Sequence, residues 1–364
     1  MNGELMTALG QLEREKGISK EIILDALEAA LIKAYNRHFG SADNVRVYVD
    51  RRTGQVQVYA SKTVVENVTE PHYELSVEEA VRMNPDYEVD DVVEEEVTPK
   101  DFGRIAAQTA KQVVMQRLRE AQRGMIFDEY ASREGEIITG VVQRVENRAV
   151  IVDLGKTEAV LLPNEQMRVE NYRFGDRIKS YIVEVKRTPK GPQVLLSRTH
   201  PGLVKRMFEL EVPEISDGTV EIKAVSREAG SRSKVAVFSR DPNVDAVGSC
   251  VGPKGMRVQT VVSELKGEKI DIVEWSLDPE QLVANALSPS QVVSVVCHEA
   301  EKVARVVVPD HQLSLAIGKE GQNVRLAARL TGWKIDIKSE SQARSGISAG
   351  VFVGDGDDDE SVEE

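Results

Sequence analysis

The sequence has little cysteine and no long apolar run. Its two Cys residues, at 250 and 297, lie outside any CxxC or Cys/His ligand pattern. No apolar run reaches the roughly 18 residues that a membrane helix needs, and residues 1–10 lack the basic start and apolar block of a secretion signal. We therefore expect a cytoplasmic protein that does not associate with membranes and keeps both thiols free.

The sequence also lacks the motifs of common catalytic and cofactor sites. It has no phosphate-binding GxxxxGK loop, and its five His residues are scattered. A nuclease needs clustered carboxylates for metal ions or a phosphate-activating site. The acidic residues at 90–96 are more typical of a solvated strand edge. We expect no enzymatic activity, no cofactor and no metal site.

Charge is distributed unevenly along the 364 residues. The net charge is -13, which taken alone argues against a nucleic-acid partner. Residues 1–133 contain 17 basic and 24 acidic side chains, and residues 346–364 contain seven acids and no base. Residues 134–345 contain 30 basic and 29 acidic side chains, so the middle of the chain is close to neutral. A neutral region is compatible with a local basic stripe, and a chain of this length is expected to form several domains.

The first 133 residues mix helical and strand periodicity. Apolar spacing predicts a helix over residues 5–12 and a stronger one over residues 23–34. Alternating residues at 45–49 and 56–59 flank a turn and predict a hairpin, and a further strand is predicted at 92–97. This region is therefore expected to fold as an α/β domain.

A long helix is predicted to begin at residue 98. Thr98 is expected to cap it, Pro99 suits its first turn, and Asp101 completes a capping box. Its apolar stripe is predicted to contain Ala107, Ala110, Val114 and Leu118. The opposite face carries Arg104, Gln108, Lys111, Met115 and Arg119. That face is either a solvated helix surface or a docking surface for a partner.

From residue 134 the pattern becomes all-β. Five short strands are predicted within about 65 residues, which is typical of a small closed barrel. Such a barrel resembles the S1-type OB fold, which presents a strand face and loops to single-stranded RNA. Aromatic residues are scarce there, and Tyr172, Phe174 and Tyr181 are the candidates for base stacking. Packing in the core or at the barrel end is at least as good an explanation for these three.

An internal repeat is the strongest feature of the sequence. Residues 247–258 and 313–324 match at an offset of 66, and each contains a GxxG pair with apolar residues at helical spacing on both sides. Two strands are predicted before each segment and one after it. The order αββααβ is that of a prokaryotic-type KH domain. A plain helix-turn-helix with glycine caps is the alternative, but the matched context of both copies argues against it.

The KH pattern has a direct physical interpretation. Two Gly residues without Cβ let the backbone approach phosphates, a helix N-terminus faces the anion, and the neighbouring groove holds about four unstacked bases. The residues expected to contact RNA are Gly252, Pro253, Lys254, Gly255 and Arg257 in the first unit, and Gly318, Lys319, Glu320, Gly321, Gln322, Asn323 and Arg325 in the second. The acid at 320 disfavours phosphate, so we expect the first loop to bind more strongly.

The order of these segments, with residues 96–109, 211–215 and the two GxxG units, resembles the NusA family of transcription factors. The resemblance covers residues 1 to about 345. It implies a multidomain α+β protein: an α/β N-terminal domain with a long helix (1–133), an S1-type OB β-barrel (134–200) and two tandem type II KH domains (201–276 and 277–345). A disordered acidic tail (346–364) is expected to follow.

The family resemblance also implies the partners. The N-terminal domain is expected to dock on RNA polymerase, with Arg104, Gln108, Lys111 and Arg119 on the docking face, and its acidic character fits a protein partner rather than RNA. The S1 and KH units are expected to hold nascent single-stranded RNA, with other Nus factors as further partners. These activities modulate pausing, termination and antitermination, and a monomer is expected. Two alternatives remain open: a ribosome-associated RNA-binding protein and an accessory subunit of an RNA-processing enzyme.

Overall fold

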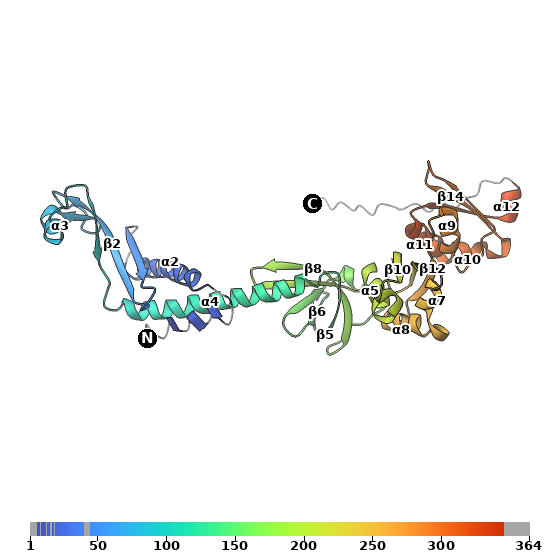
Figure 1. The fold of residues 1–364 in the computed structure, drawn as a ribbon, viewed down its shortest axis with the longest axis horizontal. Coiled ribbons are helices and arrows are strands. Elements are labelled where there is room, and N and C mark those ends of the chain that lie inside the picture. Colours follow the sequence, from blue (N-terminus) through green and yellow to red (C-terminus); the bar gives the residue numbers. More distant parts are fainter. Residues whose placement is uncertain are drawn as a thin grey trace. The chain divides into compact units, whose positions relative to one another are not determined.

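The structure is a computed structural model that describes residues 6–7, 9–11, 13–14, 17, 19–39 and 44–345. The chain divides into two compact units, residues 1–125 and 126–364, and each is described by itself. Element labels follow Figure 1. Leu5 and Leu12 of the first predicted helix and the predicted acidic tail lie outside the described residues. Within the described part of the chain, no helix is both long enough and apolar enough to span a membrane.

The first unit packs helices against a four-stranded sheet. Its helices are α2 (Lys20–Phe39), α3 (Val77–Met83) and the start of α4 (Phe102–Ala131). Its strands are β1 (Val45–Val49), β2 (Val56–Val65), β3 (Glu74–Ser76) and β4 (Val92–Glu96), with β2 paired to the other three. Leu27 and Leu31 of α2, Val47 and Val58 of the sheet and Phe102 of α4 are buried together, as the helical and alternating patterns predicted.

The predicted start of the long helix is wrong by four residues. The Thr98 hydroxyl does not cap α4; it accepts a hydrogen bond from the Val58 amide at 2.9 Å and donates to Glu96. The Val97 amide also donates to the Val58 carbonyl, so the chain continues along β2 until residue 98. Because these groups extend the sheet, α4 begins only at Phe102.

The buried stripe of α4 also differs from the prediction. Phe102, Ala106 and Ala110 are buried, whereas Ala107 is exposed. A long helix packed at its N-terminal end presents the i, i+4, i+8 positions to the core, and here that series starts at Phe102.

The second unit begins with a closed five-stranded barrel, as predicted. Its strands pair in the order β5-β6-β7-β9-β8. They are β5 (Ile137–Glu146), β6 (Ala149–Asp153), β7 (Glu158–Leu161), β8 (Arg177–Thr188) and β9 (Gly191–Ser197). Alternate aliphatic residues such as Val142, Val152 and Ile182 fill the interior.

Two domains with the same topology follow the barrel and confirm the predicted αββααβ repeat. The first consists of α5 (Pro201–Glu211), α6 (Pro213–Ser216), β10 (Val220–Glu228), β11 (Arg232–Ser239), α7 (Ala246–Val251), α8 (Met256–Glu264) and β12 (Lys269–Glu274). The second consists of α9 (Pro279–Ala286), β13 (Ser294–His298), β14 (Val303–Val308), α10 (Leu313–Ile317), α11 (Gln322–Thr331) and β15 (Lys334–Ser339), followed by α12 (Glu340–Arg344). In each sheet the first two strands are antiparallel and the third is parallel to the second.

The outer face of the first KH sheet is not exposed to solvent. Ala236 of β11 and Val273 of β12 are buried in one cluster with Val283 and Ala286 of α9. The second KH domain therefore packs on the sheet of the first, and their GxxG loops belong to one compact body.

Candidate nucleic-acid interface

The two GxxG loops have nearly the same backbone conformation. Gly252 has φ 72° and ψ 174°, and Gly318 has φ 78° and ψ 170°. The third loop residues, Lys254 and Glu320, lie at φ 54° and 57°. The repeat detected in the sequence is therefore a repeat of backbone geometry as well.

The glycines are required for two different reasons. A Cβ on Gly252 would lie 2.7 Å from Cγ of Arg257, and one on Gly318 would lie 2.7 Å from the amide nitrogen of Asn323. A Cβ on Gly255 would lie 4.0 Å from Val258 and one on Gly321 would lie 3.9 Å from Val324, which are ordinary contacts, but the φ values of 76° and 74° disfavour any other residue. The first glycine of each pair thus permits a close approach, and the second permits the turn into the helix.

Both loops lie at uncapped helix N-termini. The helices α8 and α11 start directly after Gly255 and Gly321, and no side chain caps either of them. The first amides of a helix have no partner within it and attract anions. Lys254 and Lys319 are exposed beside these amides. The geometry of the two loops is therefore compatible with the predicted anion binding.

Two of the predicted contact residues support the loops from behind. Arg257 donates to the carbonyl of Ser249 at 2.6 Å, and Asn323 donates to the carbonyl of Ala316 at 3.0 Å. These carbonyls lie near the end of the helix that precedes each loop. The Asn323 side chain is only 3% exposed and also donates to the Leu287 carbonyl, so its amide is occupied within the fold.

Gln322 and Arg325 join the two KH domains. Both side chains donate to the Glu228 carboxylate at the end of β10, at 2.6 and 2.8 Å, and Gln322 also donates to the Ser231 hydroxyl. Burial raises the pKa of Glu228, but the hydrogen bonds from Gln322 and Arg325 outweigh it and hold that pKa below its ordinary value. The first turn of α11 is thus fixed to the β10–β11 hairpin.

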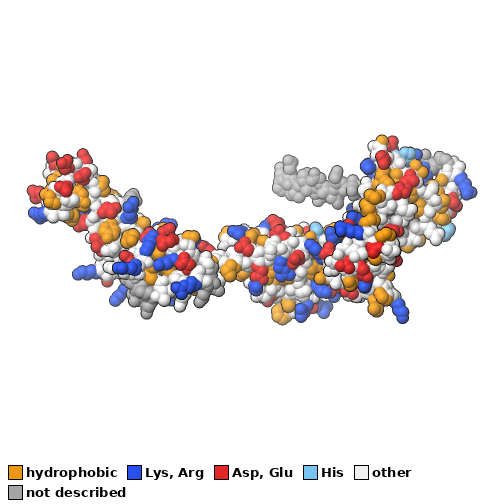
Figure 2. Space-filling view, in the orientation of Figure 1, with side chains coloured by type: hydrophobic (Ala, Val, Ile, Leu, Met, Phe, Trp, Pro, Cys, Tyr) orange, Lys and Arg blue, Asp and Glu red, His pale blue; other side chains and the backbone are white. Residues whose placement is uncertain are grey.

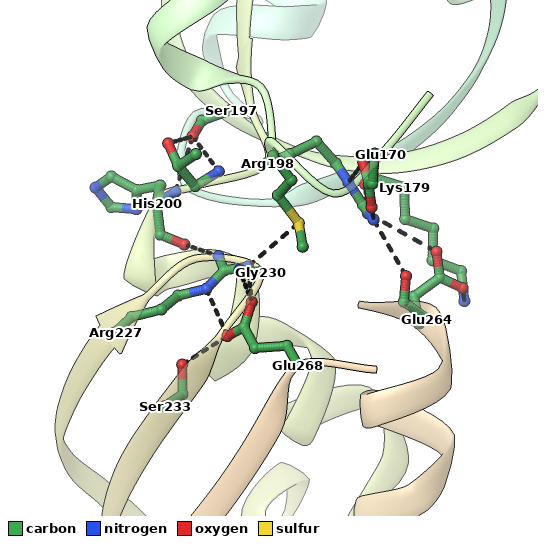
Figure 3. Close-up of polar contacts among 12 residues, drawn as sticks. Glu170, Lys179, Ser197, Arg198, His200, Arg227, Gly230, Ser233, Glu264 and Glu268 are labelled. Atoms are coloured by element: carbon green, nitrogen blue, oxygen red, sulfur yellow. Dashed lines mark hydrogen bonds and ion pairs between the residues drawn. The ribbon is translucent and has the colours of Figure 1, made fainter. Parts of the chain in front are cut away.

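A buried ionic junction between the barrel and the first KH domain escaped the sequence analysis. Arg198, which follows β9, forms an ion pair with Glu170 and donates to the Glu264 carbonyl at the end of α8 (Figure 3). Arg227 of β10 pairs with Glu268 (Figure 3). The partners are 28 to 66 residues apart in the chain, and no local pattern links them.

The three aromatic candidates of the barrel have different environments. The Tyr172 hydroxyl accepts a hydrogen bond from the Met167 amide, and burial raises its pKa well above the ordinary value. The Tyr181 ring stacks on His200 with 4.5 Å between ring centroids. Phe174, by contrast, is 85% exposed. Packing accounts for the two tyrosines but not for Phe174.

The predicted docking face of α4 is exposed. Arg104, Gln108, Lys111 and Arg119 all face solvent. Lys111 also lines a cavity of about 350 Å³ whose walls are mainly apolar and include Leu27, Val56, Ala107 and Met115. An apolar cavity beside cationic and amide side chains is suited to a side chain of a protein partner.

Acidic side chains gather elsewhere on the first unit, around α3 (Figure 2). The exposed acids of this part are Glu66, Glu70, Glu78, Glu79, Asp86 and Glu88. A surface of this sign repels nucleic acid.

Comparison with protein-family models assigns every part of this architecture. The NusA N-terminal domain model matches residues 4–124, the S1 RNA binding domain model residues 132–197, and the NusA-like first and second KH domain models residues 198–275 and 279–345. Among solved structures, the N-terminal domain of NusA from Bacillus subtilis is 63% identical and covers 34% of this chain and 99% of its own, with a TM-score of 0.31.

Full-length relatives match almost the entire chain. A protein of Halalkalibacterium halodurans is 65% identical over 94% of this chain and 90% of its own length, and one of Bacillus subtilis is 64% identical over 94% and 93%. A protein of Mycobacterium tuberculosis is 46% identical over 95% of this chain and 98% of its own. All three are named transcription termination/antitermination protein NusA. With this identity over nearly its whole length, the chain belongs to the NusA family of transcription termination/antitermination proteins.

Proposed function

We propose that this protein docks on RNA polymerase through its N-terminal domain and holds nascent single-stranded RNA on its S1 and KH domains. It thereby modulates pausing, termination and antitermination. The observation that carries the proposal is the pair of open GxxG loops, which have the same backbone geometry and an uncapped helix behind each.

The RNA contact combines main-chain and side-chain groups. Gly252, Pro253, Lys254 and Gly255 contact the RNA backbone in the first loop, and Gly318, Lys319 and Gly321 do so in the second. Glu320 weakens the second loop because its carboxylate repels phosphate. Arg257 and Asn323 hold the loops in shape, while Gln322 and Arg325 fix the second loop relative to the first KH domain.

The polymerase contact lies on α4. Arg104, Gln108, Lys111 and Arg119 form its polar part, and the neighbouring apolar cavity accepts a side chain of polymerase. The acidic surface around α3 keeps RNA away from this unit. The two activities therefore use separate surfaces, with the division between them at about residue 133.

The remaining features follow from this assignment. The protein acts as a monomer in the cytoplasm, cooperates with other Nus factors, and has no catalytic activity, cofactor or metal. We propose the remaining domain boundaries at residues 200, 276 and 345.

The test separates the two surfaces in one experiment. Gly252→Asp together with Gly255→Asp is expected to weaken binding of single-stranded RNA and to leave co-purification with RNA polymerase unchanged. Arg104→Glu together with Lys111→Glu is expected to do the opposite. If each pair abolishes both activities equally, the model of two surfaces is wrong.

A further inference from the structure

An exposed aromatic ring lies at the tip of a barrel loop whose backbone is fixed by hydrogen bonds. Phe174 and Gly175 form a turn in which the Asp176 amide donates to the Arg173 carbonyl at 3.1 Å, and the Asp176 carboxylate accepts from the Arg173 amide at 2.8 Å. Gly175 has φ 87°, as the third residue of a type II turn requires. The Gly175 amide and the Asp176 carbonyl are both bonded to Val142 of β5. The backbone of the turn is thus fixed in the free protein, and the ring of Phe174 is presented to solvent.

The two arms of the same loop line a polar cavity. This cavity of about 260 Å³ lies between the barrel and the end of α8. Asn171 and Tyr172 line it from the arm before the turn, Arg177 from the arm after it, and Lys266 from the first KH domain. It is large enough for a nucleobase and offers hydrogen-bonding groups on its walls.

Among the charged side chains that line the cavity and form no ion pair, the positive ones outnumber the negative ones. Three carboxylates line it, at 170, 176 and 264; the first is paired with Arg198 and the last with Lys179 at 3.4 Å. Within the described residues, neither Arg177 nor Lys266 has an ion-pair partner. The exposed carboxylate of Asp176 accepts a hydrogen bond from the Arg173 amide within the turn. Two cations thus remain available for phosphate groups.

The position of the cavity connects it with the first KH loop. The helix α8 begins directly after Gly255 and has nine residues, so it is about 14 Å long. Its far end, at Glu264, lies at the cavity. One RNA strand that leaves the GxxG loop can therefore reach the barrel along this helix.

We propose that the turn 173–176 and the adjoining cavity form a further RNA site, in which one base stacks on Phe174 and its neighbour enters the cavity beside Asn171, with Arg177 and Lys266 on the backbone. The site accepts unstacked nucleotides of single-stranded RNA. This inference rests on the proposed function, because it extends the RNA path of the KH loops onto the barrel. Ring stacking and unpaired cations are the combination that binds single strands without strict sequence preference.

The test compares two lengths of RNA on the full-length protein. A labelled single strand of about eight nucleotides suffices for two KH grooves of about four bases each, and a second strand is twice as long. Phe174→Ala is expected to weaken binding of the longer RNA by about 5- to 150-fold, since loss of one base–aromatic stack costs about 1–3 kcal/mol. The shorter RNA is expected to bind as before. Phe174→Trp is expected to restore the affinity, and its added indole fluorescence to be quenched by RNA.

Two control variants test whether the change in RNA affinity depends on the aromatic ring of Phe174. Leu277→Ala removes a side chain that is 86% exposed and lies outside the loop, so it is expected to leave both affinities unchanged. Phe174→Leu keeps an apolar side chain without a ring and is expected to behave as Phe174→Ala. If Phe174→Ala binds the longer RNA like the unmodified protein, or if it reduces only polymerase binding, the inference is overturned.

The experiments distinguish failure of the additional RNA site from failure of the proposed function. If Gly252→Asp with Gly255→Asp abolishes RNA binding while Phe174→Ala has no effect, the proposed function stands and the additional site is refuted. If neither change affects RNA binding, both are refuted.

Discussion

The guanidinium of Arg227 donates to both carboxylate oxygens of Glu268, each at 2.9 Å, and neither side chain is exposed. The same carboxylate accepts from the Ser233 hydroxyl and the Gly230 amide (Figure 3). Arg227 also donates to the carbonyl of His200, where the barrel is joined to the first KH domain. Because this buried pair is surrounded by further hydrogen bonds, the charges are well compensated only while both partners are present.

Removal of either Arg227 or Glu268 alone is therefore expected to destabilise the fold. Arg227→Ala leaves a buried, unpaired carboxylate and is expected to lower the free energy of unfolding by about 3–5 kcal/mol. Trp275 directly follows β12 and Trp333 directly precedes β15, so the fluorescence of these two Trp residues during urea denaturation reports on this unit. A loss below about 1 kcal/mol would show that the pair does not stabilise the junction.

An exposed pair in the same unit provides the control. Arg144 donates to both oxygens of Glu158 at 2.8 Å, but both side chains are about half exposed. Arg144→Ala is expected to leave the free energy of unfolding nearly unchanged, because solvent screens the pair.

The interface between the KH domains is expected to weaken in acid. Burial raises the pKa of Asp271, but Arg232, at 2.7 and 2.8 Å, and Lys234, at 3.1 Å, outweigh it and hold that pKa below its ordinary value. A carboxyl with a lowered pKa stabilises the fold above its unfolded pKa of about 3.9, and this contribution is lost as the pH falls through the folded value. Lys234 also donates to the Ser288 carbonyl of the second KH domain, so the loss affects that interface.

Asp271→Asn tests this pH dependence. The variant is expected to be less stable than the unmodified protein in urea at pH 7, and the difference is expected to shrink below about pH 4. The midpoint of unfolding, followed by Trp fluorescence at several pH values, checks it. A difference that stays constant with pH would contradict the role of the Asp271 charge.

The second GxxG loop is expected to depend on Asn323. Asn323→Ala removes an amide that donates to the carbonyls of Ala316 and Leu287 and leaves both without this donor in a buried place. The expected loss of stability is about 1–3 kcal/mol, together with weaker RNA binding because the loop loses its support. Asn323→Asp retains the shape but not the donors, so it is expected to be no better. Unfolding and RNA titration of both variants measure the two effects, and an unchanged stability would contradict the supporting role.

The features that the sequence predicts best are helices and strands with a local periodic pattern of apolar residues. The two helix–GxxG–helix segments, the strands around them and the five barrel strands were all predicted from periodicity, and the structure confirms them. What the sequence could not predict depends on contacts distant in the chain. Thr98 bonds with β2 instead of capping α4, and Asn323 is buried by α9 and α10.

The residues of the candidate site likewise fall into those that local patterns predict and those whose role depends on distant contacts. The glycines of the loops follow from the motif, because a GxxG turn needs them at a fixed spacing, and each loop contains one lysine between them. The attachment of Gln322 and Arg325 to Glu228 spans 94 and 97 residues and arises only when one KH domain packs on the other. No periodicity encodes such a pair.

Glu320 is the acidic side chain of the second loop, and its replacement is expected to strengthen RNA binding by that loop. It occupies the position of Lys254 in the first loop, with φ and ψ of 57° and 25° against 54° and 24°. Because a lysine already adopts this conformation in the same protein, Glu320→Lys is expected to leave the fold intact. A new phosphate contact steepens the fall of log K with log salt by about 0.7 for a single strand. RNA titrations at several salt concentrations therefore should show tighter binding at low salt and a steeper slope, while the reciprocal Lys254→Glu shows the reverse. If Glu320→Lys changes neither affinity nor slope, the second loop does not face the RNA backbone.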